Sequence, residues 1–466
     1  MPMNLALRYD LIIIGAGPAG MSAAIYASEN DMTVLVLDDQ PSGGGQVYRH
    51  VMQNDAAENK ADFLGNDYWS GHKLANDFTL SSAAFWPESR VWQITKDRDV
   101  FFSQKGKAHR AQADAILIAT GAMERPMPIA GWTLPGVMTI GAAQTMLKTS
   151  QSGVDGALFV GSGPLFYLTI WQYLNAGFDI KAVIDTAPGR MSLISCLWAL
   201  PALLQPNMLM KGLKWRSEIR RKTRYLSGAT AVSISGAGKA DAINFTDADG
   251  EKHRIEAENI FLHQGVVPSI NLTMATELEH KWCARQLCWH PKTDLFGESS
   301  LKQIFVAGDG MGIAGAAAAI TSGKIAAMRI TAKARRRLSI NAAFQMLRQI
   351  QKMAIRPFLD HAFRPADDWL VPTDDNAIIC RCESLTKADI TKALTLSVSG
   401  PNQLKSFSRA GMGRCQGRMC GLTVQKMISD HNNQSEDKTG YYRLRPPIRP
   451  LTVGELAALA DDTPTS

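Results

Sequence analysis

A strand, a glycine-rich turn and a helix are expected within residues 9–40, YDLIIIGAGPAGMSAAIYASENDMTVLVLDDQ, and together they restrict the chain to few folds. The apolar run at 11–14 is typical of a buried parallel strand. Gly15, Gly17 and Gly20 follow as G-x-G-x-x-G. In this turn the first glycine allows the tight bend, the second lets the backbone approach a pyrophosphate, and the third lets the helix pack on the strand. The turn therefore predicts a dinucleotide-binding α/β domain.

The residues after the turn complete this unit. A helix is expected to begin at Pro18 and Ala19, with its first amide groups facing the phosphates. A second apolar strand at 34–37 ends in Asp38, placed to accept hydrogen bonds from a ribose 2′-OH, and Asp39 follows it. Because strand, turn, helix, strand and acid occur in this order, we favour a nucleotide site over a glycine-rich turn that binds nothing.

The loop at 40–49 lies just past the ribose-binding strand and is rich in glycine. Such a loop cannot form a helix, but it can pass along a long cofactor, to which Gln46 and Arg49 would offer hydrogen-bond donors. A flexible surface loop is the alternative. Flavin disulfide reductases need two thiols stacked against the isoalloxazine, either in this loop or in the next domain. The chain supplies no such pair, so we reject that class.

Two further segments return the chain to the same sheet. Residues 115–121 predict a buried strand that ends in a turn of small residues, and the Pro- and Gly-rich stretch 122–140 predicts a crossover between domains. A strand at 303–307 leads through Gly308 and Asp309 into a helix of small residues. Asp309 can bind a sugar-like hydroxyl chain, and the positive end of the helix would stabilise negative charge on a reduced flavin.

A second nucleotide-type unit is expected at 157–185. A strand leads into a turn that contains Gly161 and Gly163, but Phe166 replaces the third glycine. A side chain of that size would hold helix and strand apart or force a different approach. The next strand ends in Asp185. We give equal weight to a nicotinamide nucleotide site and to a relic of the fold that binds no nucleotide.

The most apolar stretch is residues 191–210, which Pro201 and Pro206 interrupt. A transmembrane helix needs about 20 cleaner apolar residues, so we reject a span. A basic segment at 211–224 follows, and an apolar segment beside a basic one can lie on a membrane surface. We favour the alternative, a buried partner interface beside a solvated helix.

Three potential metal ligands, Cys283, Cys288 and His290, lie close together in the sequence. No fourth ligand is near them, and buried cysteines are common in protein cores. We therefore favour core positions over a metal site for these residues.

Length, charge and cysteine content limit the class of protein. A chain of 466 residues is too long for one hydrophobic core and suggests about two to four domains. Seven cysteines without a secretory signal argue against a disulfide framework and favour a cytoplasmic metal or redox protein. The formal net charge of +7 permits an acidic partner or peripheral contact with the inner membrane. It does not demand nucleic acid, and we expect none.

Four of the cysteines form two close pairs, Cys380-x-Cys382 and Cys415-x4-Cys420. Two such pairs, brought together by a helical segment, predict a tetrathiolate site. Glycines in this stretch leave backbone N–H groups free to bond sulfur, and cations would ease thiolate formation. The cations are Arg381, Arg409, Arg414 and Arg418. The occupant is either [2Fe–2S] or zinc, and we favour [2Fe–2S] because zinc ribbons usually have C-x2-C pairs.

Six motifs together resemble one family. They are the glycine fingerprint at 15–20, Ala-Thr-Gly at 119–121, Gly-Trp-Thr-Leu-Pro-Gly-Val-Met at 131–138, Ala-Gly-Asp-Gly at 307–310, Gly-Arg-Cys-Gln-Gly-Arg-Met-Cys at 413–420 and Arg-Pro-Pro-Ile-Arg-Pro at 445–450. Over nearly its whole length the chain is similar to the FAD-containing α (A) subunits of opine oxidases, of hydroxyproline or proline dehydrogenases and of bacterial hydrogen cyanide synthase. The C-terminal motif with its C-x4-C is the specific part.

The resemblance implies two glutathione-reductase-like Rossmann-type domains and a small helical domain similar to bacterioferritin-associated ferredoxin. We expect an FAD domain at 1–125 and 255–332, an NAD-like domain at 126–254, a helical linker at 333–372, a [2Fe–2S] domain at 373–440 and a tail at 441–466. The expected cluster ligands are Cys380, Cys382, Cys415 and Cys420. The expected FAD site comprises Gly15, Gly17, Pro18, Ala19, Gly20, Asp38, Asp39, Gly45, Gln46, Arg49, Val91, Thr120, Gly121, Gly308 and Asp309.

The resemblance further implies a β subunit that carries its own FAD and the substrate site, with room for a small third, ferredoxin-like subunit. The present chain would take electrons from the oxidation of an opine, hydroxyproline or a glycine derivative and pass them to an external acceptor. One alternative is a self-sufficient NAD(P)H oxidoreductase that uses residues 157–185. Another is a docking module with structural zinc. We favour the electron-transfer subunit because the chain shows no convincing substrate base and Phe166 departs from nicotinamide-binding relatives.

Overall fold

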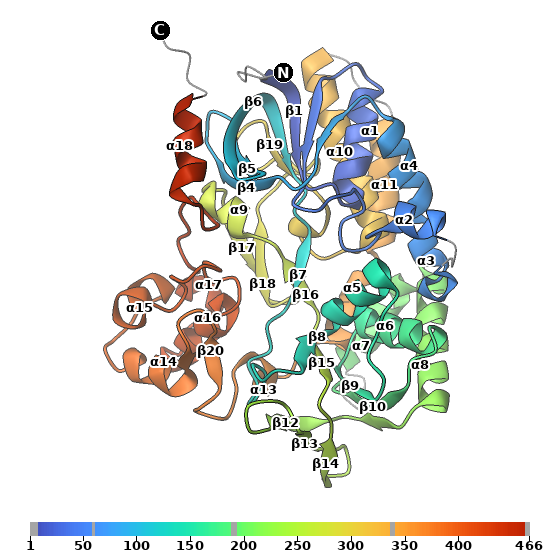
Figure 1. The fold of residues 1–466 in the computed structure, drawn as a ribbon, viewed down its shortest axis with the longest axis vertical. Helices are drawn as coiled ribbons and strands as arrows, with labels where there is room; N and C mark the ends of the chain where they lie inside the picture. The colour runs from blue at the N-terminus through green and yellow to red at the C-terminus, as the bar shows by residue number, and fades with distance from the viewer. Residues whose placement is uncertain (1–7, 58–60, 188–192, 336–340, 462–466) are drawn as a thin grey trace.

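The computed structural model describes residues 8–57, 61–187, 193–335 and 341–461. Two domains built on parallel strands stand one above the other in Figure 1, and a small helical domain lies beside them. The predicted α/β class is therefore confirmed. Across the described ranges, no helix combines the length and the apolar character needed to cross a bilayer.

The first domain is built on a seven-stranded sheet. Its strands are ordered β3 (Ala84–Trp86), β2 (Val34–Leu37), β1 (Arg8–Ile14), β6 (Lys107–Ile118), β5 (Asp99–Gln104) and β4 (Arg90–Ile94), and β19 (Ile304–Val306) pairs with β6. β1 pairs in parallel with β2 and β6, whereas β4, β5 and β6 form an antiparallel meander. β2 is buried along its whole length, as its unbroken apolar run predicts.

The helices of the first domain bring two N-termini to one end of this sheet. The helices are α1 (Pro18–Ser28), α2 (Val51–Ala56), α3 (Asn66–Trp69), α4 (Gly71–Leu80) and α10 (Ala316–Arg335). α1 and α10 pack closely, because a Cβ atom at Gly323 would lie 2.0 Å from the backbone oxygen of Ala19. α1 follows β1, and α10 follows β19 through a short 3-10 turn, Gly308–Gly310. Both helices therefore begin at the carboxyl ends of parallel strands, where nucleotides bind in such sheets.

The second domain contains a five-stranded parallel sheet, ordered β11 (Tyr225–Ser227), β10 (Ile180–Asp185), β9 (Ala157–Gly161), β15 (Ile260–His263) and β8 (Val137–Thr139). Its helices are α5 (Ile140–Ser150), α6 (Pro164–Asn175), α7 (Leu193–Ala202) and α8 (Pro206–Lys222). A three-stranded antiparallel sheet, β12 (Thr230–Ser235), β13 (Ala242–Thr246) and β14 (Lys252–Glu256), completes the domain.

The chain returns to the first domain later than we expected. We placed the boundary at residue 255, but β15 pairs with β8 and β9 in the second sheet. An apolar strand suits either sheet, and its own sequence does not specify its partner. The chain instead crosses back through β16 (Val266–Pro268), which pairs with β7 (Ala122–Glu124) of the outgoing crossover. This two-stranded ribbon joins the two domains. α9 (Asn271–Ala275) and the hairpin β17 (His280–Cys283) and β18 (Cys288–Pro291) follow.

The C-terminal domain shares a core with the first sheet. Three helices lead to it, α11 (Asn341–Met353), α12 (Arg356–Ala362) and α13 (Asp367–Leu370). The domain contains β20 (Ile378–Cys380), β21 (Leu385–Thr386), α14 (Lys387–Leu394), α15 (Pro401–Ser408), α16 (Gly421–His431) and α17 (Glu436–Thr439). The expected separate tail is instead part of the packed structure, because Tyr442, Leu444 and Ile448 join the core that contains Trp92. α18 (Val453–Asp461) then packs beside β6 (Figure 1).

Candidate functional site

One large cavity lies where the carboxyl ends of the first sheet meet the second domain. Its volume is about 1290 Å³, larger than the ~300–1000 Å³ of ordinary small-molecule sites. The residues expected to contact FAD line this cavity, with the exception of Gly20 and Arg49. Gly20 lies beneath the turn, where an added Cβ would meet the backbone oxygen of Gly15 at 1.8 Å. Arg49 instead donates hydrogen bonds to the side chains of Gln40 and Gln46, at 2.7 and 3.1 Å.

The glycine-rich loop at 40–49 is held against the first glycine turn. The N–H of Gly44 donates to the backbone oxygen of Ala16 at 2.8 Å. Gly45 approaches the same turn so closely that an added Cβ would lie 2.9 Å from the Cα of Gly17. The loop is therefore a fixed wall of the cavity, which contradicts the alternative of a flexible surface loop.

Asp38 is anchored by two backbone amides. Its Oδ2 accepts a hydrogen bond from the N–H of Ala16 at 2.5 Å, and its Oδ1 accepts one from the N–H of Gln40 at 2.8 Å. The side chain is 8% exposed, and burial raises its pKa to about 6 despite these bonds. Because each carboxylate oxygen has two lone pairs, acceptor capacity remains for a hydroxyl group in the cavity.

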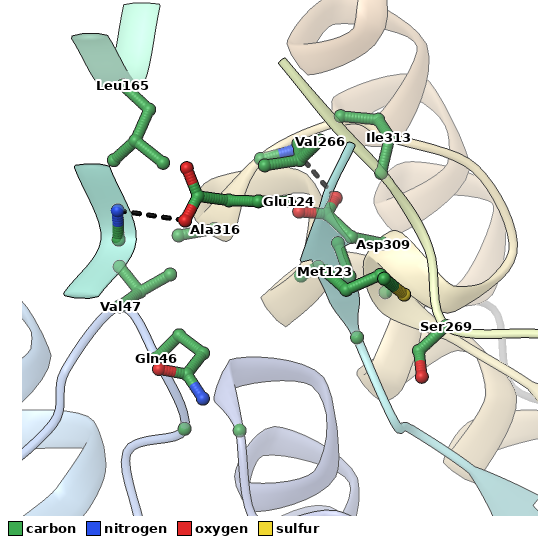
Figure 2. Close-up of a pocket in the computed structure, with 18 of the residues that line it drawn as sticks. Gln46, Val47, Met123, Glu124, Leu165, Val266, Ser269, Asp309, Ile313 and Ala316 are labelled. Carbon is green, nitrogen blue, oxygen red and sulfur yellow. Dashed lines mark hydrogen bonds between the residues drawn. The ribbon is translucent and has the colours of Figure 1, made fainter. Parts of the chain in front are cut away.

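Asp309 closes the turn that precedes α10. Its Oδ1 accepts hydrogen bonds from the N–H groups of Ala314 and Gly315, both at 2.8 Å. Ala316, at the start of α10, lines the same cavity, and in Figure 2 it lies beside the carboxylate of Glu124. The carboxylate of Asp309 and the positive end of a helix therefore face one space, the combination that the sequence predicted for a flavin.

The cavity also contains a pair that no sequence motif predicts, Glu124 and His263. Glu124 Oε1 lies 2.8 Å from His263 Nδ1, and Glu124 Oε2 accepts a hydrogen bond from the N–H of Gly141 at 2.9 Å. In Figure 2 Glu124 projects from β7 toward Leu165. The two side chains are 15% and 2% exposed. Each lies at the end of a strand, but 139 positions separate them, so no local pattern pairs them.

Lys148 of α5 is a second missed residue. Its Nζ donates to the backbone oxygen of Gln46 at 2.9 Å and to Gln144 Oε1 at 2.8 Å. The residue is 3% exposed, and this burial, together with the charge of Arg49, lowers the pKa of its ammonium group to about 7. Lys148 thus links the glycine-rich loop at 40–49 of the first domain to α5 of the second domain.

The second nucleotide-type unit does not offer its acid to a ribose. Asp185 is wholly buried, and its carboxylate accepts hydrogen bonds from the hydroxyl groups of Tyr167 and Tyr225, from Arg216 at 3.2 Å and from the N–H of Ala187 at 2.9 Å. Phe166 is also wholly buried. The strand, turn and helix are present as predicted, but the position that would recognise ribose is occupied by this chain's own side chains.

The four clustered cysteines come together as two pairs. The thiol of Cys380 interacts with that of Cys420, and the thiol of Cys382 interacts with that of Cys415. Each pair thus joins one cysteine of C-x-C to one of C-x4-C. The Cys420 thiol, and then the N–H groups of Gly411, Glu383 and Cys382, lower the pKa of Cys380 to about 6.

The four arginines predicted to lie near these cysteines make different contacts. Arg409 pairs with Glu383 at 3.1 Å, and Arg381 lies over the ring of Trp132. Arg414 is exposed. The charge of Arg418 interacts with the Cys415 thiol.

Among the described residues, the ligand atoms of Cys283, Cys288 and His290 do not all lie within 4.8 Å of one another, although Cys288 Sγ is 3.5 Å from His290 Nε2. Cys283 and Cys288 face each other across the β17–β18 hairpin, and no third ligand of the described chain joins them within 4.8 Å. Cys288 is 2% exposed, and burial raises the pKa of its thiol to about 12. The expectation of core positions is met for Cys288.

The C-terminal domain also reaches the cavity. Arg418, Ile448 and Arg449 line it, although no sequence motif predicts a cofactor contact beyond Asp309. Arg418 lies between Cys415 and Cys420, so the loop that carries two cluster cysteines also forms part of the cavity wall. No cysteine of the described part of the chain lines the cavity.

Comparison with known proteins gives two family matches. Residues 9–323 match the pyridine nucleotide-disulphide oxidoreductase family, and residues 375–460 match the sarcosine oxidase A3 domain. The A subunit of opine oxidase from Rhizobium meliloti is 40% identical, with 97% of this chain and 88% of the relative covered. The HcnB subunit of hydrogen cyanide synthase from Pseudomonas aeruginosa is 30% identical, with 94% and 96% covered.

A solved structure shows the same fold over nearly the whole chain. L-proline dehydrogenase from P. horikoshii superposes with a TM-score of 0.72 at 16% identity, covering 97% of this chain and 79% of that one. The glutathione-reductase-like fold with a C-terminal A3 domain is therefore confirmed. The chain belongs to the family of HcnB and the opine oxidase A subunits, within the pyridine nucleotide-disulphide oxidoreductases, and is an FAD-dependent oxidoreductase subunit.

Proposed function

We propose that this chain is the electron-transfer subunit of a heteromeric dehydrogenase or oxidase of an opine or amino acid. It takes electrons from a partner subunit that oxidises the substrate on its own FAD and passes them to an external acceptor. The observation that carries the proposal is the shared wall between two sites: Arg418 of the four-cysteine loop also lines the large cavity. Bound FAD accepts two electrons and a [2Fe–2S] cluster accepts one, so both groups on one chain convert a two-electron supply into single-electron steps.

The cavity suits FAD along its length. Gly15 and Gly17 leave room for a pyrophosphate at the N-terminus of α1, Asp38 retains acceptor capacity for a ribose, and Asp309 lies before α10 for a ribityl chain. Lys148 and the loop around Gln46 hold the second domain against this site. These residues would bind and orient the cofactor.

The cysteine geometry supports two metal ions rather than one. A single zinc ion with Zn–S bonds of about 2.3 Å places its four sulfurs at mutual distances of about 3.8 Å. No three of Cys380, Cys382, Cys415 and Cys420 lie within 4.8 Å of one another in the described chain, whereas they associate two by two. Backbone N–H groups directed at Cys380 and Cys415 are typical of iron–sulfur sites. The residues therefore fit a [2Fe–2S] cluster.

The alternative of an NAD(P)H oxidoreductase is not supported by the second domain. The carboxylate of Asp185 is saturated by Tyr167, Tyr225 and Arg216. A ribose would have to displace these buried partners.

An exposed apolar surface supports the proposed partner. Leu200 of α7 and Leu203 just after it are 69% and 62% exposed, and Leu347 and Ile350 on α11 are each 66% exposed. A hydrogen bond of 3.2 Å from Gln205 to the backbone of residue 351 joins the two segments. Large exposed apolar patches mark interaction sites. We therefore propose a partner interface for the described part of residues 191–210.

Anaerobic spectroscopy of the purified chain, with and without its partner subunit, tests the proposal. We expect flavin and iron–sulfur absorption from the chain alone, no bleaching by NADH, and bleaching by the amino-acid or opine substrate only when the partner is present. Zinc in place of iron, or rapid bleaching by NADH alone, would contradict it.

A further inference from the structure

We propose that the C-terminal domain completes the FAD site, with Arg418 and Arg449 as cationic contacts for the adenosine half of the cofactor and Ile448 as its apolar cover. The inference depends on FAD as the occupant of the cavity, but not on the route of the electrons. It assigns a binding role to residues that lie outside the dinucleotide-binding domains.

The adenosine end of the cavity is identified by the first domain. In this fold the acid after the second strand marks the ribose, here Asp38 and Asp39. Val91 at the start of β4 lines the same end of the cavity. A ligand held by the glycine turn therefore places its adenosine between these strands.

The segment 445–450 is fixed at this end by two hydrogen bonds. The N–H of Ile448 donates to the backbone oxygen of Trp92 at 3.1 Å, next to Val91. Arg449 donates to Asp39 Oδ2 at 2.9 Å. Ile448 is 5% exposed and Val91 is 7% exposed, and both line the cavity. Two apolar side chains from different domains therefore flank the space beside the ribose position.

Arg418 approaches the same carboxylate from the cluster loop. Its charge interacts with Asp39, with Arg449 and with Cys415. Arg90 also interacts with Asp39. Three guanidinium groups thus share one carboxylate at this end of the cavity, which leaves an excess of positive charge there.

Two donors at this position have no protein acceptor. The Nε atoms of Arg418 and Arg449 are buried and form no hydrogen bond within the described chain. Buried donors are normally satisfied, and guanidinium groups bind phosphate and other oxygen-rich anions well. FAD brings such oxygens to the adenosine end, so one ligand would satisfy both the charge and the donors.

The geometry also links the two sites of the chain. Arg418 lies between Cys415 and Cys420, two of the proposed cluster ligands. The same loop would therefore contact FAD and the iron–sulfur cluster. A change at Arg418 should therefore weaken the binding of FAD while the four cysteines remain in place.

Binding measurements on full-length, flavin-free protein test the proposal with two probes, FAD and ADP. ADP carries only the adenosine half. We expect Arg418→Ala and Arg449→Ala each to weaken the binding of both FAD and ADP about tenfold or more, the effect of losing one charge-assisted hydrogen bond. Arg418→Lys and Arg449→Lys should recover part of the affinity because they keep the charge.

Two exposed arginines provide matched controls. Arg414 lies in the same cysteine loop and Arg445 in the same C-terminal segment, and neither lines the cavity. Their alanine variants should bind FAD and ADP as the unmodified chain does. Iron content and thermal midpoint, measured for every variant, show that the domain is folded.

The outcomes separate this inference from the proposed function. Unchanged ADP binding in both Arg418→Ala and Arg449→Ala overturns the inference, as does an equal loss of binding in the two controls. If the alanine variants do not fold, the lysine variants decide by the same comparison. An unmodified chain that binds FAD but never receives electrons from a partner would contradict the proposed function and leave the adenosine contacts intact.

Discussion

Asn271 of α9 donates a hydrogen bond of 3.0 Å to the backbone oxygen of Gln416, the residue after Cys415. Asn271 is 4% exposed and lines the cavity, whereas Gln416 belongs to the cysteine loop. A side chain from the rim of the first domain thus sets the position of a loop in the third. The two proposed prosthetic groups are held by one continuous set of contacts.

Asn271→Ala should loosen the cysteine loop. We expect the variant to lose about 1 kcal/mol of stability, the net value of one hydrogen bond, and to release iron faster than the unmodified chain. Iron release can be followed by the loss of visible absorption in the presence of a chelator. As a control, Asn376→Ala changes an exposed residue of the C-terminal domain and should release iron at the rate of the unmodified chain. Equal rates in all three proteins would show that Asn271 does not hold the loop.

Glu124→Ala should destabilise the junction between the two large domains. The substitution leaves the His263 ring and the N–H of Gly141 without their shared acceptor, at an expected cost of about 1–3 kcal/mol. Glu124→Gln keeps one carbonyl acceptor and should lose less. Denaturant unfolding of the two variants, followed by fluorescence, gives the comparison. An equal loss in the two variants would mean that the negative charge, rather than the retained hydrogen-bond acceptor, stabilises the junction.

The stability of the flavin-free protein should rise with pH because of Lys148. Its pKa is lowered from 10.5 to about 7, so above about pH 7 the unfolded chain binds more protons at this residue than the folded chain does. Stability rises with pH wherever the unfolded state binds more protons, here by up to about 1.4 kcal/mol per pH unit. Below about pH 7 both states are protonated and the contribution is constant.

Lys148→Gln provides the measurement. The free energy of unfolding of the unmodified chain minus that of the variant should be flat below about pH 7 and rise between about pH 7 and pH 9. A difference in unfolding free energy that stays constant, or falls, across this interval would contradict the lowered pKa of Lys148.

Cys415→Ser should remove the metal from the C-terminal domain, because it deletes one of four thiolate ligands. We expect iron and acid-labile sulfide to fall well below the amounts in the unmodified chain, whereas FAD binding is retained. Cys283→Ser, a cysteine outside the four, is the control and should keep its iron. Full iron content in Cys415→Ser would remove this cysteine from the ligand set.

Local motifs predicted the parts of the site that one segment builds by itself. The turn at Gly15 and Gly17, and the acid at Asp38, lie within one strand–helix–strand unit whose geometry is determined by neighbours in the chain. The same holds for Asp309, which accepts hydrogen bonds from N–H groups five and six residues later. Such contacts follow from sequence spacing alone.

The remaining parts depend on pairings between distant segments. Arg449 and Asp39 are 410 positions apart, and no pattern in either segment indicates the other. The boundary at residue 255 failed for the same reason, since an apolar strand suits either sheet. Asp185 illustrates the reverse case: the motif predicted its place correctly, but its partners Tyr225 and Arg216 lie 40 and 31 residues away.

The core that the first sheet shares with the C-terminal domain means that the third domain is not a detachable module. Ile448 and Leu444 pack in the same apolar cluster as Trp92 of β4 and Leu272 of α9. A chain truncated at residue 372 would keep both parallel sheets but expose these side chains to water. Engineering a smaller flavoprotein from this scaffold would therefore require new polar residues on β4 and α9, as well as a stop codon.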